Sequence, residues 1–154
     1  MPTPKEFNLL KVIQKIELFS HLTIEEAQIV LSLSERKTYE PGKTVFRKGE
    51  VPHFFVILIS GQLRLSEVNS MKNETDYTTD PGESNGAINA LTRRPHWFTV
   101  TAQQSSTVLS FDILTLRTLI SSNSALYCRI LERALELAGK LIDVHGDFIL
   151  DENR

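Results

Sequence analysis

The feature that most constrains the fold is a series of short apolar segments between residues 36 and 111, each closed by a turn sequence. The segments are rich in β-branched and aromatic residues, and four of the breaks carry Gly or a Pro-Gly pair, at residues 41–42, 48–50, 60–62 and 81–83. The expected strands are Thr44–Phe46, Phe54–Ile59, Gln62–Leu65, Phe98–Ala102 and Thr107–Phe111. Short strands spaced roughly 8–12 residues apart are typical of an antiparallel sandwich or barrel. We therefore predict a mainly β fold with flanking helices, an antiparallel β-barrel or jelly roll (double-stranded β-helix).

The placement of glycine supports this pattern. Five of the seven glycines stand at breaks between expected strands, namely Gly42, Gly49, Gly61, Gly82 and Gly86. Glycine adopts a positive φ without steric cost, so these positions suit tight turns. The stretch 66–79 is polar throughout and predicts a hairpin excursion.

Helical periodicity flanks the β region on both sides. Before it, apolar residues recur every three or four positions, and Thr23 with Glu26 matches a capping box. After it, a short helical pattern ends at Ser121, and a longer helix is expected from about Ala125. We expect one domain over residues 1–154. Its N-terminal helices cover about 6–35, its barrel about 36–111 and its C-terminal helices about 112–150.

Charge and cysteine content exclude several classes of function. Seventeen Lys and Arg residues against nineteen Asp and Glu residues give a net charge of −2. Such a chain has no excess positive field, so we expect no direct binding to nucleic acid or to a membrane. The single cysteine, Cys128, cannot form a disulfide within the chain, which suits a reducing compartment. The N-terminus lacks the apolar core of a signal peptide, and we expect a cytoplasmic protein.

The sequence contains no recognisable catalytic or metal-binding motif. The four histidines lack metal-ligand spacing, and one cysteine cannot build a structural zinc site. A Ser-His-Asp arrangement, a Walker loop and a paired-carboxylate motif are also missing. We therefore predict no enzymatic activity and no bound metal.

Three stretches in the chain match a known pattern: Leu18–Thr23, Tyr39–Glu50 and Val56–Leu63. With them the chain resembles the cyclic-nucleotide-binding domain superfamily, the sensory half of bacterial catabolite-activator and fumarate-nitrate-reduction type regulators. The resemblance covers roughly residues 9–145 and implies a regulatory or sensory function. The helix-turn-helix half that usually follows in the transcription factors is not part of this sequence.

The resemblance places a phosphate-binding cassette, a short helix and loop between two strands, at residues 86–100. In the family, backbone N–H groups at the helix start bind the cyclic phosphate, an arginine pairs with it, and a glutamate binds the ribose. With Val100 as the register, His96 stands at the arginine position and Ala87 at the glutamate position. The candidate ligand-binding residues are Gly86, Ala87, Ile88, Asn89, Arg93, Arg94, His96, Trp97 and Phe98.

These replacements are expected to weaken nucleotide binding. Two lost hydrogen bonds to charged groups remove about 3–6 kcal/mol, or about two to four decades of affinity. We therefore expect no cofactor and disfavour tight binding of cAMP or cGMP. Arg93 and Arg94 either reach an anion or are solvated loop charges. Trp97 and Phe98 stand where the family has small residues, and they either plug the pocket, line it for a flat or apolar ligand, or turn into the core.

The terminal helix carries the predicted partner surface. In the family this helix often forms a parallel dimer along a coiled-coil seam. The predicted contact stripe contains Ile130, Ala134, Leu137, Leu141 and Val144. A second apolar stripe beside it contains Leu131, Leu135, Ala138 and Ile142, so that one stripe can pack on the barrel while the other meets a partner. The alternative is that both stripes cover the domain's own core.

Together these features predict a regulatory module of cyclic-nucleotide-binding type that acts through a protein partner or a homodimer. The alternative is a sensor of a cyclic nucleotide or another small anionic ligand with altered specificity. A third hypothesis is the sensory part of a transcription regulator whose DNA-binding half lies beyond residue 154.

Overall fold

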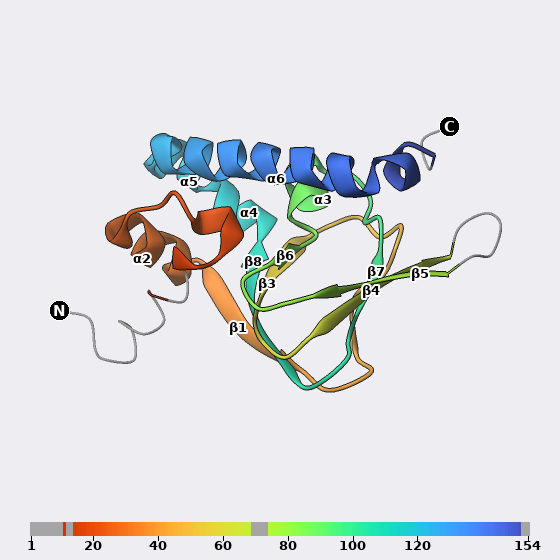
Figure 1. Ribbon diagram of the computed structural model, residues 1–154. Helices are drawn as coiled ribbons and strands as arrows, with labels where there is room; N and C mark the ends of the chain where they lie inside the picture. Colours follow the sequence, from red (N-terminus) through yellow and green to blue (C-terminus); the bar gives the residue numbers. More distant parts are fainter. Residues whose placement is uncertain (1–10, 12–13, 69–73, 152–154) are drawn as a thin grey trace.

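The computed structural model describes residues 11, 14–68 and 74–151, and within them two four-stranded antiparallel sheets (Figure 1). Their strand orders are β1-β8-β3-β6 and β2-β7-β4-β5. The strands are β1 Ser34–Tyr39, β2 Thr44–Phe46, β3 Phe54–Ser60, β4 Leu63–Val68, β5 Glu74–Thr79, β6 Ser84–Asn85, β7 Thr99–Ala102 and β8 Ser106–Asp112. The predicted mainly β jelly roll with flanking helices is confirmed, but its two sheets do not close into a barrel.

Helices lie on one side of the sheets, and α6 runs along the top of the molecule above α3 and α4 (Figure 1). The helices are η1 Glu17–Phe19 (a 3-10 helix), α2 Ile24–Ser32, α3 Ala87–Thr92, α4 Ile113–Arg117, α5 Leu119–Ser122 and α6 Ser124–Asp151. The long helix expected from about Ala125 is thus confirmed, one residue earlier. The first part of the predicted helical region 6–35 lies outside the described residues.

The N-terminus of α2 is capped as the sequence predicts. Thr23 Oγ1 accepts a hydrogen bond from the Glu26 N–H at 3.2 Å, and Glu26 Oε1 accepts one from the Thr23 N–H at 3.1 Å. The other carboxylate oxygen of Glu26 pairs with Arg129 of α6. The hydrogen bond from Arg129 is the main cause that holds the pKa of Glu26 below its ordinary value. One carboxylate therefore caps α2 and joins it to α6.

Strand β3 separates two apolar clusters, because successive side chains of a strand point to opposite faces. Phe55 and Ile57 belong to a cluster shared with the helices. Val56 and Leu58 belong to a second cluster shared with the other sheet. All four side chains have no exposed surface. The cassette helix α3 packs on the first cluster, so the core fixes its position beside β3.

The sequence predicted the apolar strands better than the polar ones. Thr44–Phe46 is confirmed at its predicted bounds, and the polar stretch 66–79 contributes to the hairpin of β4 and β5. Strand β1 was not predicted, because its sequence SERKTY is polar and lacks a buried alternating face. Pairing with β8 along its whole length makes it a strand.

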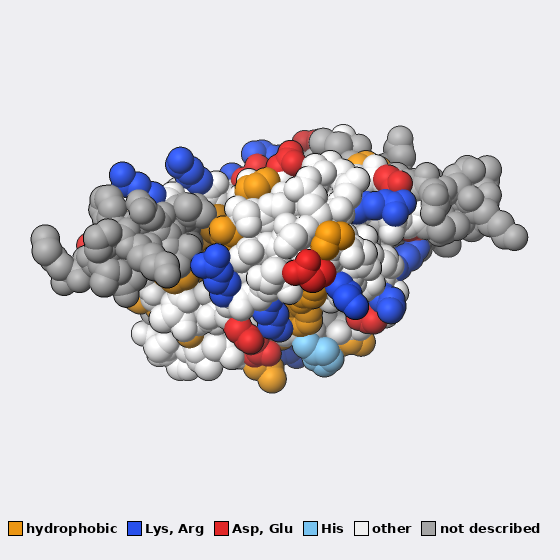
Figure 2. All heavy atoms as spheres, turned by 90° about the horizontal axis from the view of Figure 1, so that it is seen from below, with side chains coloured by type: hydrophobic (Ala, Val, Ile, Leu, Met, Phe, Trp, Pro, Cys, Tyr) orange, Lys and Arg blue, Asp and Glu red, His pale blue; other side chains and the backbone are white. Residues whose placement is uncertain are grey.

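The face of the molecule that points away from α6 has a mixed surface (Figure 2). Lys and Arg side chains are interspersed there with Asp and Glu, and hydrophobic side chains form small separate spots. This face therefore presents no continuous basic area. Over the part of the chain that the structure describes, no helix combines the length and apolarity that a membrane span requires.

Candidate functional site

The frame of the predicted cassette is formed by β6, α3 and the loop that follows. Strand β6 pairs with β3 and delivers Asn85 to the start of the cassette. Helix α3 begins after Gly86, which has a φ of 80°, and is followed by its C-cap residue Arg93, which has a φ of 58°. Asn89 Nδ2 donates a hydrogen bond to the carbonyl of Pro95 at 2.9 Å. This bond ties the loop back onto the helix.

Gly86 is required at its position for two reasons. Its φ lies in the left-handed region, which residues with a Cβ rarely adopt. A Cβ there would lie 2.8 Å from His96 Cε1 and 2.9 Å from Phe46 Cζ. Glycine therefore allows two rings to lie directly against the backbone of the cassette.

His96, at the arginine position of the family pattern, is buried in a ring stack. Its ring lies on that of Phe46 with centroids 3.7 Å apart and an interplanar angle of 7°. The backbone N–H of His96 donates a hydrogen bond to the carbonyl of Glu50 at 3.0 Å, and the backbone carbonyl of His96 accepts one from the Gly49 N–H at 2.9 Å. Burial lowers the pKa of His96, and the charge of Glu50 opposes this only in part. The ring is therefore neutral at pH 7 and supplies no cation for a phosphate.

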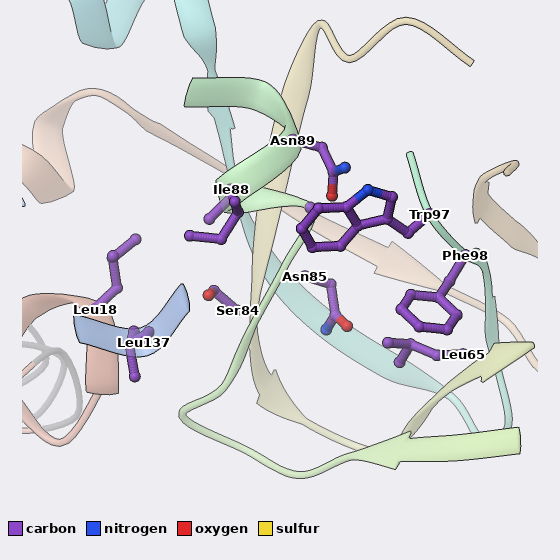
Figure 3. A pocket seen from close by; sticks show the side chains of 11 residues that line it. Leu18, Leu65, Ser84, Asn85, Ile88, Asn89, Trp97, Phe98 and Leu137 are labelled. Carbon is purple, nitrogen blue, oxygen red and sulfur yellow. The ribbon is translucent and has the colours of Figure 1, made fainter. Parts of the chain in front are cut away.

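A half-open pocket of about 100 Å³ lies beside the cassette (Figure 3). It is lined by Leu18, Leu65, Ser84, Asn85, Gly86, Ala87, Ile88, Asn89, Trp97, Phe98 and Leu137. Leu18 of η1 and Leu137 of α6 lie at one end, and Leu65 of β4 and Phe98 lie at the other (Figure 3). None of these lining residues carries a charged side chain. Among the described residues, no group of three or more His, Cys, Asp or Glu residues is arranged to hold a metal ion.

The pocket wall contains six of the nine predicted ligand residues, namely Gly86, Ala87, Ile88, Asn89, Trp97 and Phe98. Arg93, Arg94 and His96 are not part of it. Both arginines are exposed, and the Arg94 N–H donates to the carbonyl of Asn89 at 3.0 Å. The structure thus separates the candidate cations from the pocket.

Sequence reasoning missed other residues of the wall. Ser84 and Asn85 directly precede Gly86, and extending the cassette by two residues would have found them. Leu18 and Leu65 come from distant elements, and only the folded chain brings them to the pocket.

The two large rings of the cassette lie in the wall of the pocket. The indole of Trp97 extends toward α3 and its residue Asn89 (Figure 3). Phe98 lies edge-on to Tyr77, with ring centroids 5.8 Å apart. Neither Trp97 nor Phe98 belongs to the two apolar core clusters. The rings therefore line and narrow the pocket and do not turn into the core.

Asn85 combines deep burial with an incomplete set of hydrogen bonds. Its side chain is in the pocket wall, and the residue is 4% exposed. The Thr79 hydroxyl donates to Asn85 Oδ1 at 3.0 Å. Asn85 Nδ2 has no hydrogen-bond partner among the described residues. Asn85 therefore carries a buried amide donor that no described protein group satisfies.

The predicted contact stripe of α6 faces inward over its described part. Ile130 is fully buried and Ala134 is 4% exposed. Leu137 packs against the same core and lines the pocket. The side chains of Leu141 and Val144 lie outside the described ones. The described residues of this stripe cover the domain's own core.

The second stripe of α6 faces outward. Leu135 is 73% exposed and Ile142 is 55% exposed. Ala138 between them is partly exposed, and Leu131, one turn before Leu135, is partly buried and packs against the core cluster. We call Leu131, Leu135, Ala138 and Ile142 the outer stripe; Leu135 and Ile142 are its exposed apolar residues.

Comparison with known sequences gives one family and distant relatives. The sequence profile of the cyclic nucleotide-binding domain matches residues 36–123. The potassium channel AKT1 of rice (Oryza sativa subsp. indica) is 24% identical over 118 residues. That match covers 77% of this chain and 13% of the channel, so the chain spans a small part of this relative.

Several solved structures share the fold. A cyclic nucleotide-binding domain from Methylobacillus flagellatus has a TM-score of 0.81 and 18% identity, covering 96% of this chain and 84% of that one. The regulatory subunit of a cAMP-independent protein kinase A from Trypanosoma brucei, a mutant bound to cAMP in the A site, has a TM-score of 0.76 and 14% identity, covering 97% and 52%. The N-terminal domain of a transcriptional regulator from Streptomyces coelicolor has a TM-score of 0.75 and 19% identity, covering 86% and 94%. At such identities the likeness establishes the fold.

Proposed function

The chain belongs to the cyclic nucleotide-binding domain family, and we propose that it is a regulatory module of this family that acts through a second copy of itself or another protein. In this proposal it does not bind cAMP or cGMP tightly, carries no cofactor and is not an enzyme. The observation that carries the proposal is the wall of the pocket, which has no charged side chain.

A cyclic nucleotide is an anion, and the pocket offers its phosphate no counter-charge. Arg93 and Arg94 are exposed and lie outside the wall, and the neutral ring of His96 is committed to Phe46. Burying an anion without a partner is costly. Two missing hydrogen bonds to charged groups weaken binding by about 3–6 kcal/mol. These observations support the proposal that the pocket does not bind cyclic nucleotides tightly.

The size of the pocket supports the same proposal. Pockets for small-molecule ligands typically measure roughly 300–1,000 Å³. The present pocket measures about 100 Å³, because Trp97 and Phe98 stand in its wall. A nucleotide would have to displace both rings. The Trypanosoma brucei neighbour has the same fold and is the regulatory subunit of a protein kinase that is independent of cAMP.

Titration calorimetry with cAMP and with cGMP tests the nucleotide part of the proposal. We expect no heat at millimolar nucleotide and no shift in melting temperature. A micromolar dissociation constant for either nucleotide would contradict the proposal. A micromolar response of the Trp97 fluorescence would instead support the alternative function, a nucleotide or anion sensor with altered specificity.

A reconstruction of the family pattern provides the positive control. The variant combines Ala87→Glu, His96→Arg, Trp97→Ser and Phe98→Ala, which restores the two ligand groups and the two small residues. We expect this variant to bind cAMP or cGMP at least about a hundredfold more tightly than the natural chain. Its melting curve without nucleotide shows whether it is folded.

The outer stripe of α6 supports the interaction part of the proposal. Cys128, Leu135 and Ile142 are exposed and stand seven residues apart, the repeat of one coiled-coil position. Leu131 and Ala138 occupy the other apolar position of the same repeat. In a parallel pair of α6 helices, equal positions face each other. We therefore propose a second copy of this chain as the partner of the outer stripe.

Sedimentation velocity tests this dimer. The natural chain is expected to dimerise, and the double variant Leu135→Lys with Ile142→Lys to be a folded monomer with an unchanged circular-dichroism spectrum. Leu114→Lys on α4 is the matched control, because Leu114 is 72% exposed against 73% for Leu135. A natural chain that stays monomeric at high micromolar concentration would contradict the dimer.

Oxidation of the natural cysteine tests the direction of the two helices. Disulfides require Cα atoms about 4.4–6.8 Å apart, which a parallel, in-register pair provides at Cys128. We expect a cross-linked dimer on a non-reducing gel under mild oxidant. An antiparallel pair would give a dimer by sedimentation without this cross-link.

A further inference from the structure

The pocket contains a hydrogen-bond donor that the fold leaves unused. Asn85 is held in place on β6, and its Oδ1 accepts from Thr79 at 3.0 Å. Asn85 lines the pocket, and its Nδ2, buried behind the pocket surface, has neither water-accessible surface nor a partner among the described residues. A buried donor without a partner carries an uncompensated desolvation cost. An acceptor delivered into the pocket would remove that cost after a small rotation of the amide.

The surroundings of this donor are apolar and aromatic. Leu65, Ile88, Trp97 and Phe98 are among the side chains that line the pocket with Asn85 (Figure 3). Their side chains favour an apolar body and allow a flat group to lie against the indole. The lining residues contain no cation, so a carboxylate or phosphate in this place would lack a counter-charge.

The volume limits what the pocket can enclose. A dry cavity of about 150 Å³ is known to hold benzene. The present pocket of about 100 Å³ encloses a smaller group, of roughly four non-hydrogen atoms by the same proportion. Because the pocket is half-open, a larger molecule can leave its remaining part outside.

We propose that this pocket binds a small uncharged molecule whose buried end is a compact apolar group with one hydrogen-bond acceptor, held by Asn85 Nδ2. A methyl ketone on an aromatic ring has this chemistry. The proposal goes beyond the function proposed above, which assigns no ligand to the pocket.

Three probes of similar shape test the proposal by NMR on the natural chain. Acetophenone has the acceptor, isopropylbenzene has a methyl group in place of the oxygen, and benzoate has a negative charge. The reporters are the side-chain amide of Asn85 and the indole N–H of Trp97, the only tryptophan in the chain. We expect acetophenone to shift both signals. Isopropylbenzene should bind at least about fivefold more weakly and leave the Asn85 amide in place, and benzoate should shift neither signal.

The opposite results would overturn the proposal. They are equal binding of acetophenone and isopropylbenzene, benzoate binding as tight as that of acetophenone, or no shift of Asn85 and Trp97 with any probe.

The variant Asn85→Asp tests the donor itself, because it keeps an oxygen for the Thr79 hydroxyl and removes the NH₂ group. In this variant, folded by its melting curve, the preference for acetophenone over isopropylbenzene should disappear. A preserved preference would assign the contact to another group. Failure of this proposal is distinguishable from failure of the proposed function, because the proposed function is tested with cAMP and cGMP and neither nucleotide is among these probes.

Discussion

The cassette around α3 and the outer stripe of α6 differ in what they offer to another molecule. At the cassette, His96 stacks on Phe46 against the backbone of Gly86, and the remaining space is small and uncharged. On α6, Leu135 and Ile142 are more than half exposed. The region that grips an anion in the family pattern is occupied by packing, whereas the helix beside it leaves apolar surface open. This contrast favours α6 as the site of interaction.

The largest expected effect concerns the packing of the cassette. Gly86→Ala places a Cβ in a left-handed conformation, at roughly 1–2 kcal/mol, and against two rings, at roughly 1–3 kcal/mol. We expect the free energy of unfolding to fall by about 2–5 kcal/mol in urea denaturation. Gly42→Ala is the matched control, because Gly42 has a φ of 84° and nothing within 4 Å of its would-be Cβ. Equal losses for the two variants would show that the ring stack yields easily.

A glycine-to-alanine substitution on α6 is expected to raise the free energy of unfolding, whereas the one at Gly86 lowers it. Gly139 lies within the helix, and a Cβ there would meet nothing within 4 Å. Alanine is favoured over glycine inside helices by about 1 kcal/mol. Gly139→Ala should therefore raise the free energy of unfolding by about 1 kcal/mol in the same assay. A loss of stability would indicate that this part of α6 is closely covered in solution.

The smallest expected effect is a dependence of stability on pH at His96. Burial lowers the pKa of His96, so near pH 6.5 the unfolded chain binds more protons than the folded chain. The contribution of His96 to the free energy of unfolding should be fully present above this pH. It should fall as the pH decreases toward the folded-state pKa, by at most about 1.4 kcal/mol per pH unit. Urea denaturation between neutral and mildly acidic pH measures the slope.

Replacing the ring isolates its contribution. His96→Phe keeps an aromatic ring on Phe46 and removes the titrating group, so the slope near pH 6.5 should decrease. His53→Phe, at an exposed position, is the control. An unchanged slope in the His96 variant would assign the acid sensitivity to other groups.

The sequence was sufficient for most of the fold because its signals are local. Turn glycines and β-branched segments marked strands such as Thr44–Phe46, and Thr23 with Glu26 marked the start of α2. Strand β1 was not predicted, because its polar residues form a strand only through pairing with β8. Closure into a barrel depends on how two sheets meet, which no local pattern records.

The candidate site was predictable only along its own segment. The family pattern located Gly86 to Asn89 together with Trp97 and Phe98. It could not show that the ring of His96 turns onto Phe46, a residue fifty positions earlier. Periodicity likewise found two stripes on α6 without deciding which one faces inward, since both have apolar residues at helical spacing. Burial of Ile130 against the core decides this for the described part.

Glu26 has a consequence for how the molecule opens. Its carboxylate serves the first turn of α2 and also the guanidinium of Arg129 on α6, two elements separated by about a hundred residues of chain. Fraying of α2 would thus remove the counter-ion from α6 at the same moment. Backbone amides in the second turns of both helices, next to Glu26 in α2 and around Arg129 in α6, should therefore exchange with solvent deuterium as one cooperative unit, although each helix begins at the surface.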